Sequence, residues 1–101
     1  MKVIDHAPSW WFLFEEDGNL FLDGNYSHSA FGYDWMIQLT PDERKRYEQR
    51  GHDFIESLAR DVQDSCPLAN PKSAYVSRRV PADYSQRATS AVQEWNSASR
   101  T

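Results

Sequence analysis

The feature that most constrains the fold is an Asp-Gly pair, residues 17–18, between two apolar runs, residues 10–16 (WWFLFEE) and 20–22 (LFL). Asp-Gly is typical of a type I′ turn, because both central positions of that turn take positive φ. Apolar runs on both sides of such a turn indicate two antiparallel strands. The sequence therefore predicts a β-hairpin near the start of the chain.

The length of the hairpin loop sets the strand register. A two-residue loop places Phe14 opposite Phe21, whereas a three-residue loop that includes Asn19 places Phe14 opposite Leu22. Neither strand alternates cleanly between apolar and polar residues. We therefore expect both faces of the hairpin to be partly covered, unless one face is an interaction surface.

The triplet Asp-Gly-Asn occurs twice, at residues 17–19 and 23–25, and this repeat suggests comparison with a calcium loop. A helix-loop-helix calcium site needs oxygen ligands at its first, third and fifth positions, just before its glycine. Aligning either glycine with that loop puts Leu13 or Phe21 at a ligand position, so the motif fails. The first triplet is expected to turn the hairpin and the second to end or bulge a strand, and no metal site is predicted.

The cleanest strand signal lies in residues 31–39 (FGYDWMIQL), where aromatic and aliphatic side chains recur at every second position. Residues 23–30 are expected to connect this strand to the previous one, with the second strand running on through Tyr26. Residues 2–5 (KVID) are a candidate for a short edge strand.

Two later segments carry helical patterns. A capping signal at residues 40–43 (TPDE) begins the first, and apolar residues at helical spacing continue to Val62. Gly51 lies inside this pattern and indicates either close contact with the sheet or a break into two helices. A last helix is expected to begin near Asp83, followed by a frayed tail over residues 96–101.

The remaining segments complete the predicted topology. Residues 65–73 contain two prolines and predict a loop, and residues 74–80 (AYVSRRV) predict a strand that ends at Pro81. The expected order is strand, strand, strand, helix, strand, helix. We therefore expect a single α+β domain over residues 1–101, with an antiparallel meander of three to four strands and both amphipathic helices on one sheet face.

Charge is unevenly distributed along the chain, whose net charge is −4. Residues 1–43 hold eight acidic residues against one lysine, for −7, whereas residues 44–101 carry +3. The acidic first half argues against nucleic acid as a partner, because phosphate contacts need a positive surface. The basic clusters at residues 44–46 and 78–79 are expected to be a solvated helix face and charges on an edge strand.

The single cysteine, Cys66, excludes an intramolecular disulfide and favours a reducing compartment. The apolar run at residues 10–14 is too short for a secretory signal or a membrane span. We therefore expect a cytoplasmic protein with no membrane partner. No phosphate loop, dinucleotide fingerprint or nucleophile elbow occurs, so no cofactor is predicted.

Only weak candidates for catalysis are present. The three histidines, His6, His28 and His52, lie more than 20 residues apart, which does not match the close pairs of zinc sites. His28 is flanked by Tyr26 and, further on, by Asp34, and these three side chains are the candidates for a small hydrolase with His28 as general base. A solvated hairpin loop is the competing interpretation of this segment.

Aromatic residues are concentrated in residues 10–35. If two helices cover only one face of a small sheet, some of these rings stay exposed, and exposed aromatic surface usually marks a partner site. A large aromatic core is the competing interpretation. The predicted binding residues combine these rings with two neighbouring acids: Trp10, Phe12, Phe14, Phe21, Tyr26, Tyr33, Asp23 and Asp34.

In general format, with about 100 residues, acidic charge, one cysteine and no catalytic motif, the chain resembles the small bacterial immunity proteins that neutralise toxins. That resemblance is one of format, carried by no residue motif, and it implies an inhibitor of another protein. The leading hypothesis is a protein-binding module whose aromatic surface supplies anchors and whose acidic rim steers a basic partner. A homodimer through the same surface and a hydrolase using His28 are the alternatives.

Overall fold

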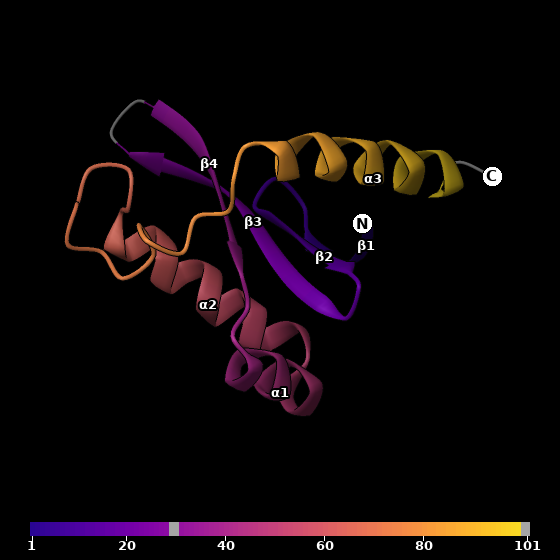
Figure 1. The fold of residues 1–101 in the computed structure, drawn as a ribbon, viewed down its shortest axis with the longest axis horizontal. Coiled ribbons are helices and arrows are strands. Elements are labelled where there is room, and N and C mark those ends of the chain that lie inside the picture. Colours follow the sequence, from indigo (N-terminus) through magenta and orange to yellow (C-terminus); the bar gives the residue numbers. More distant parts are fainter. Residues whose placement is uncertain (29–30, 100–101) are drawn as a thin grey trace.

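The computed structural model describes residues 1–28 and 31–99, and the side chains of His28, Phe31 and Ser99 lie outside that description. Four strands are followed by three helices, an α+β arrangement as predicted, although the order differs from the expected one (Figure 1). The elements are β1 (Lys2–Ala7), β2 (Trp11–Glu16), β3 (Asn19–His28), β4 (Phe31–Gln38), α1 (Pro41–Arg50), α2 (His52–Ser65) and α3 (Asp83–Ser99).

The strands form an antiparallel meander in the order β1-β2-β3-β4. Asp17 and Gly18 turn the chain between β2 and β3 with φ angles of 53° and 80°, as a type I′ turn requires. Phe14 lies opposite Phe21, which confirms the register of the two-residue loop. The candidate edge strand also forms, and it runs to Ala7, beyond the predicted end.

The second Asp-Gly-Asn triplet neither ends nor bulges a strand, so that expectation is wrong. Gly24 lies in the middle of β3 and pairs regularly with Trp11 on one side and Trp35 on the other. A Cβ at Gly24 would lie only 1.9 Å from the Cζ atom of the Tyr26 ring. Glycine is therefore required here because the Tyr26 ring lies against the strand's own backbone, not because the chain turns.

The predicted strand over residues 74–80 is also absent. Successive backbone bonds of the i to i+3 type, such as Val76 N to Ser73 O (3.2 Å) and Arg78 N to Tyr75 O (3.3 Å), fold the segment into turns. Its strand-like pairing with β4, among the described residues, is limited to an isolated bridge between Ile37 and Arg79. Tyr75, one of the apolar residues that suggested a strand, is buried and fixes the turns to the core.

Of the two alternatives expected for Gly51, the structure shows the break, which separates α1 from α2. Thr40 and Glu43 form the expected capping box at the start of α1. Gly51 has φ 68°, a left-handed conformation that favours glycine, and its carbonyl accepts from the Phe54 amide at the start of α2. Only α2 of this pair buries apolar residues, so α1 lies outside it and adds little to the core.

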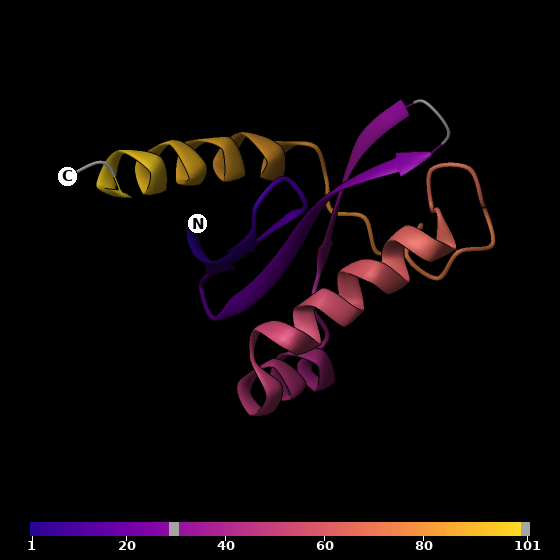
Figure 2. The same cartoon turned by 180° about the vertical axis from the view of Figure 1, so that it is seen from behind.

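The helices cover both faces of the sheet, which contradicts the expectation that they share one face (Figures 1 and 2). The α2 face carries Trp11, Leu13, Leu22, Trp35 and Ile37, which pack against Phe54, Ile55, Leu58 and Val62 of α2. The α3 face carries Phe14, Phe21 and Met36, which pack against Ala88 and Ala91 of α3. The chain is therefore a three-layer sandwich, with α2 and α3 on opposite sides of the sheet.

This arrangement removes the predicted surplus of uncovered rings. Trp11, Phe14, Phe21 and Tyr26 are each no more than 2% exposed. Among the residues that the structure describes, the exposed large hydrophobic side chains are Leu68 and Val76, and both lie outside the sheet. Within the same residues, no helix is both long and apolar enough to cross a membrane.

Candidate functional site

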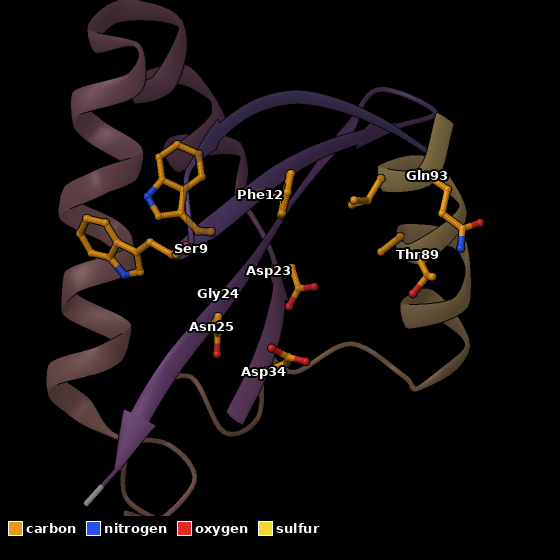
Figure 3. A pocket seen from close by; sticks show the side chains of 12 residues that line it. Ser9, Phe12, Asp23, Gly24, Asn25, Asp34, Thr89 and Gln93 are labelled. Carbon is orange, nitrogen blue, oxygen red and sulfur yellow. The ribbon is translucent and has the colours of Figure 1, made fainter. Parts of the chain in front are cut away.

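A cavity of about 360 Å³ lies between the α3 face of the sheet and α3 itself (Figure 3). The sheet side is formed by Ser9–Phe12, Asp23–Asn25 and Asp34, and the helix side by Ala88, Thr89, Val92 and Gln93. We refer to it as the acidic cavity. Its position follows from the fold, because α3 packs closely over Phe14 and Phe21 but leaves the neighbouring part of β3 and β4 partly open.

Two carboxylates, those of Asp23 and Asp34, share this cavity. Asp23 pairs with Met36 across the sheet and Asn25 pairs with Asp34, so the two aspartates are diagonal neighbours on the α3 face. Figure 3 shows both side chains on the side of the sheet that faces α3. Neither carboxylate has a hydrogen bond or a salt bridge to any described residue. Both carboxylates also line a second cavity, together with Arg79 and Ser85.

The surroundings of Asp23 are unfavourable to its charged form. Burial, and secondly the negative charge of Asp34, raise the pKa of Asp23 from 3.8 to about 6. Arg79 acts in the opposite direction without forming an ion pair, and its guanidinium stacks over the Trp35 ring at 4.3 Å. Asp23 is therefore largely ionised at neutral pH but lacks a direct counter-charge.

The ring of Phe12 forms the wall next to Asp23. Phe12 lies directly opposite Asp23 on β2 and is only partly buried. Its ring contacts those of His6 and Trp95, with centroid distances of 5.8 and 5.7 Å. Trp10 also lines the cavity, but it packs against the core cluster on the α2 side, where its ring lies 5.8 Å from the Arg60 guanidinium. The acidic cavity thus combines carboxylates with an aromatic surface.

The eight predicted binding residues lie in three different places. Phe14, Phe21 and Tyr26 are buried in the core of the chain. Tyr33 lies outside the cavity, half-buried, where its hydroxyl contacts the Cys66 sulfur at 4.0 Å. The structure brings the remaining four together around the acidic cavity: Trp10, Phe12, Asp23 and Asp34.

The residues named for a hydrolase are not brought together. The side chain of His28 lies outside the described residues. Tyr26 pairs with Tyr33 and faces α2, whereas Asp34 pairs with Asn25 and faces α3. The strand alternation therefore places Tyr26 and Asp34 on opposite sides of the sheet.

In residues 1–28 and 31–99 no group of three or more His, Cys, Asp or Glu side chains is arranged to hold a metal ion. Two carboxylates alone offer few of the oxygen ligands that calcium takes. The donor set of the acidic cavity suits an organic cation better, since that ligand needs a counter-charge and an apolar wall rather than a complete coordination sphere.

The helix side of the cavity could not be placed from the sequence. The sequence predicts an amphipathic last helix, but not that Ala88 and Val92 of this helix face the aspartates. Thr89 and Gln93 follow them by one residue, so they flank the apolar stripe as small polar side chains. The sequence shows this pattern, but it does not indicate to which face of the sheet α3 packs.

Comparison of the chain with protein-family models, with curated proteins and with solved structures gives no match. The chemistry of the acidic cavity is therefore the basis for assigning a function.

Proposed function

We propose that the protein is a protein-binding module whose acidic cavity receives a lysine or arginine side chain of a basic partner. The observation that supports this proposal most strongly is the pair Asp23 and Asp34, two carboxylates with no salt bridge to any described residue, beside the aromatic ring of Phe12. A partner's cation would supply the missing charge.

The energetic reason is the cost of leaving a half-buried carboxylate unpaired. Burial disfavours the charged form of Asp23, and an adjacent cation offsets that cost. A cationic group that lies over the face of the Phe12 ring also gains a cation–π contact, which contributes about 0.5–2 kcal/mol. Both contributions favour a cation with an apolar stem over an anion or a purely apolar group.

The rim of the cavity supports a protein as the source of that cation. Ser9, Asn25, Thr89 and Gln93 are exposed and polar, as are the residues that surround the anchor pocket of a protein interface. The acidic first half of the chain would steer a basic partner toward the site. Inhibition of a basic protein, as in the immunity-type expectation, is the form of this function that fits the charge.

The alternative of a homodimer through an uncovered sheet face has less support. α2 and α3 pack on the two faces, and three rings predicted for such an interface, those of Phe14, Phe21 and Tyr26, are buried in the core. A heterologous basic partner remains the better match, because the charges of the site do not complement themselves.

The test is an NMR titration at pH 7 with capped Gly-Arg-Gly, and with Gly-citrulline-Gly as the uncharged match. We expect the arginine peptide to shift the backbone amide resonances of Asp23, Asp34 and Thr89, and the citrulline peptide to leave them unchanged. Asp34→Asn should weaken the arginine effect, because it removes one carboxylate. Equal shifts with both peptides would contradict the proposal.

Two further arms locate the site and identify the source of the cation. Thr89→Trp fills the cavity from α3 and should abolish the response, whereas Ser90→Trp, on the same helix but outside the cavity lining, should keep it. Free arginine should bind more weakly than the peptide, which adds contacts with the polar rim. If free arginine binds as tightly, the site takes a small cation and not a protein side chain.

A further inference from the structure

A second cluster of titratable groups lies on the opposite side of the sheet, where β1 meets the two N-terminal helices. His52, the first residue of α2, contacts the Asp5 carboxylate of β1 through Nδ1 at 3.0 Å. Its other ring nitrogen, Nε2, contacts the Glu56 carboxylate at 3.1 Å. Tyr47 of α1 donates to the second Asp5 oxygen at 3.3 Å.

Proton counting determines the state of this histidine. An ionised carboxylate can only accept hydrogen bonds, and a neutral imidazole has a single N–H to donate. Both contacts can be hydrogen bonds only if both ring nitrogens carry protons. We propose that His52 is an imidazolium in the folded protein and acts as a pH-sensitive clamp that holds β1 against α2.

The surroundings of the ring favour the charged form. The charged groups that face the ring are Asp5 from β1 and Glu56 from α2. From α1, the phenol of Tyr47 donates to Asp5. From β2, the Trp11 ring lies with its centroid 5.0 Å from that of the His52 ring. Hydrogen bonding to Asp5 is the largest cause that raises the pKa of His52; desolvation opposes it, and Glu56 adds to it.

Release of the clamp follows from the loss of one proton. A neutral His52 can donate to Asp5 or to Glu56, and its other nitrogen then presents a lone pair to a carboxylate. Since the folded pKa is raised, the stabilisation is complete below the ordinary value of 6.5 and is lost as pH rises through the folded pKa. The side-chain link between β1 and the helices therefore weakens on the alkaline side.

The direct test is a long-range ¹H–¹⁵N NMR titration of the histidine rings in the folded chain and in urea. We expect the midpoint of His52 to be higher in the folded chain than in urea. Asp5→Asn should lower the folded midpoint more than Glu56→Gln does, because the Asp5 bond is the larger cause. A folded midpoint at or below the midpoint in urea would overturn the proposal.

A second measurement tests whether the His52 clamp holds β1 against α2. Amide hydrogen exchange in β1, corrected for the intrinsic pH dependence, should accelerate by about two- to fivefold above the His52 midpoint, the range expected for one exposed ion pair. His52→Gln should remove that step, and Glu48→Gln, which changes an exposed acid of α1, should keep it. The same step in His52→Gln would show that the clamp is not its cause.

Discussion

Replacement of Asp23 by asparagine should make the protein more stable at neutral pH. The pKa of Asp23 is raised from 3.8 to about 6, so its charged form is less favourable in the folded chain than in the unfolded chain. A pKa difference of one corresponds to about 1.4 kcal/mol, and the charged form therefore costs about 3 kcal/mol well above pH 6. Asparagine at this position keeps the shape of the side chain and carries no charge.

The gain in stability should be larger at high pH than at low pH. An acid whose folded pKa is raised destabilises the fold above that pKa, and the cost disappears below the unfolded pKa, where the group is protonated in both states. The gain in the free energy of unfolding should therefore be about 3 kcal/mol at pH 7.5 and about 0.5 kcal/mol at pH 4. Urea denaturation followed by tryptophan fluorescence at the two pH values measures it.

Glu94→Gln is the matched control, because it removes one negative charge from an exposed position of α3 outside the cavity lining. Its stability should change by less than about 0.5 kcal/mol at either pH. Equal or lower stability of Asp23→Asn at pH 7.5, or a gain at pH 4 as large as the gain at pH 7.5, would refute the reasoning. A variant that is more stable but no longer binds the arginine peptide is the combination expected of a binding site that costs stability.

Two other predictions concern the same sheet. Gly24→Ala should destabilise the fold by about 2–3 kcal/mol in urea denaturation, because its Cβ would collide with the buried Tyr26 ring. A Cβ at Gly32 would have its nearest neighbours at 3.8 Å, so the stability of Gly32→Ala should stay within about 0.5 kcal/mol of the parent. Equal effects of the two substitutions would contradict the close contact at Gly24. Arg79→Ala should raise the pKa of Asp23 further in a ¹³C carboxyl titration, because Arg79 lowers it; an unchanged midpoint would mean that Arg79 does not act on the cavity.

The local features of this fold could be predicted where a few neighbouring residues determine them. The Asp17-Gly18 turn, the hairpin register, the alternation of β4 and the capping box at Thr40 and Glu43 each depend on short-range geometry. The second triplet shows the limit of such reasoning. Gly24 looks like a turn residue in the sequence, yet its role depends on a ring two positions later that folds back over the strand.

The placement of α3 could not be predicted, because it depends on packing across the sheet. An apolar stripe indicates that a helix has a buried side, but both sheet faces offered aromatic residues to cover. The expected strand at residues 74–80 failed for a related reason, since Tyr75 is buried by contacts with distant residues. One of these is the hydrogen bond from Trp35 Nε1 to the Tyr75 carbonyl, at 3.1 Å.

The acidic cavity was accessible from the sequence only in part. Trp10, Phe12, Asp23 and Asp34 were among the predicted binding residues, because aromatic and acidic side chains are interleaved there. That they would meet under α3 follows from the placement of that helix. The wall formed by the helix therefore became visible only with the complete fold.

The most direct test of the central claim is a ¹³C titration of the Asp23 carboxyl group with and without the capped Gly-Arg-Gly peptide. Alone, the protein should show an Asp23 pKa of about 6. A cation bound beside the carboxylate favours the ionised form, so a saturating peptide should lower that pKa, while the citrulline peptide should leave it unchanged. The same Asp23 midpoint with and without the arginine peptide would contradict the assignment of this cavity as the binding site for a partner's cation.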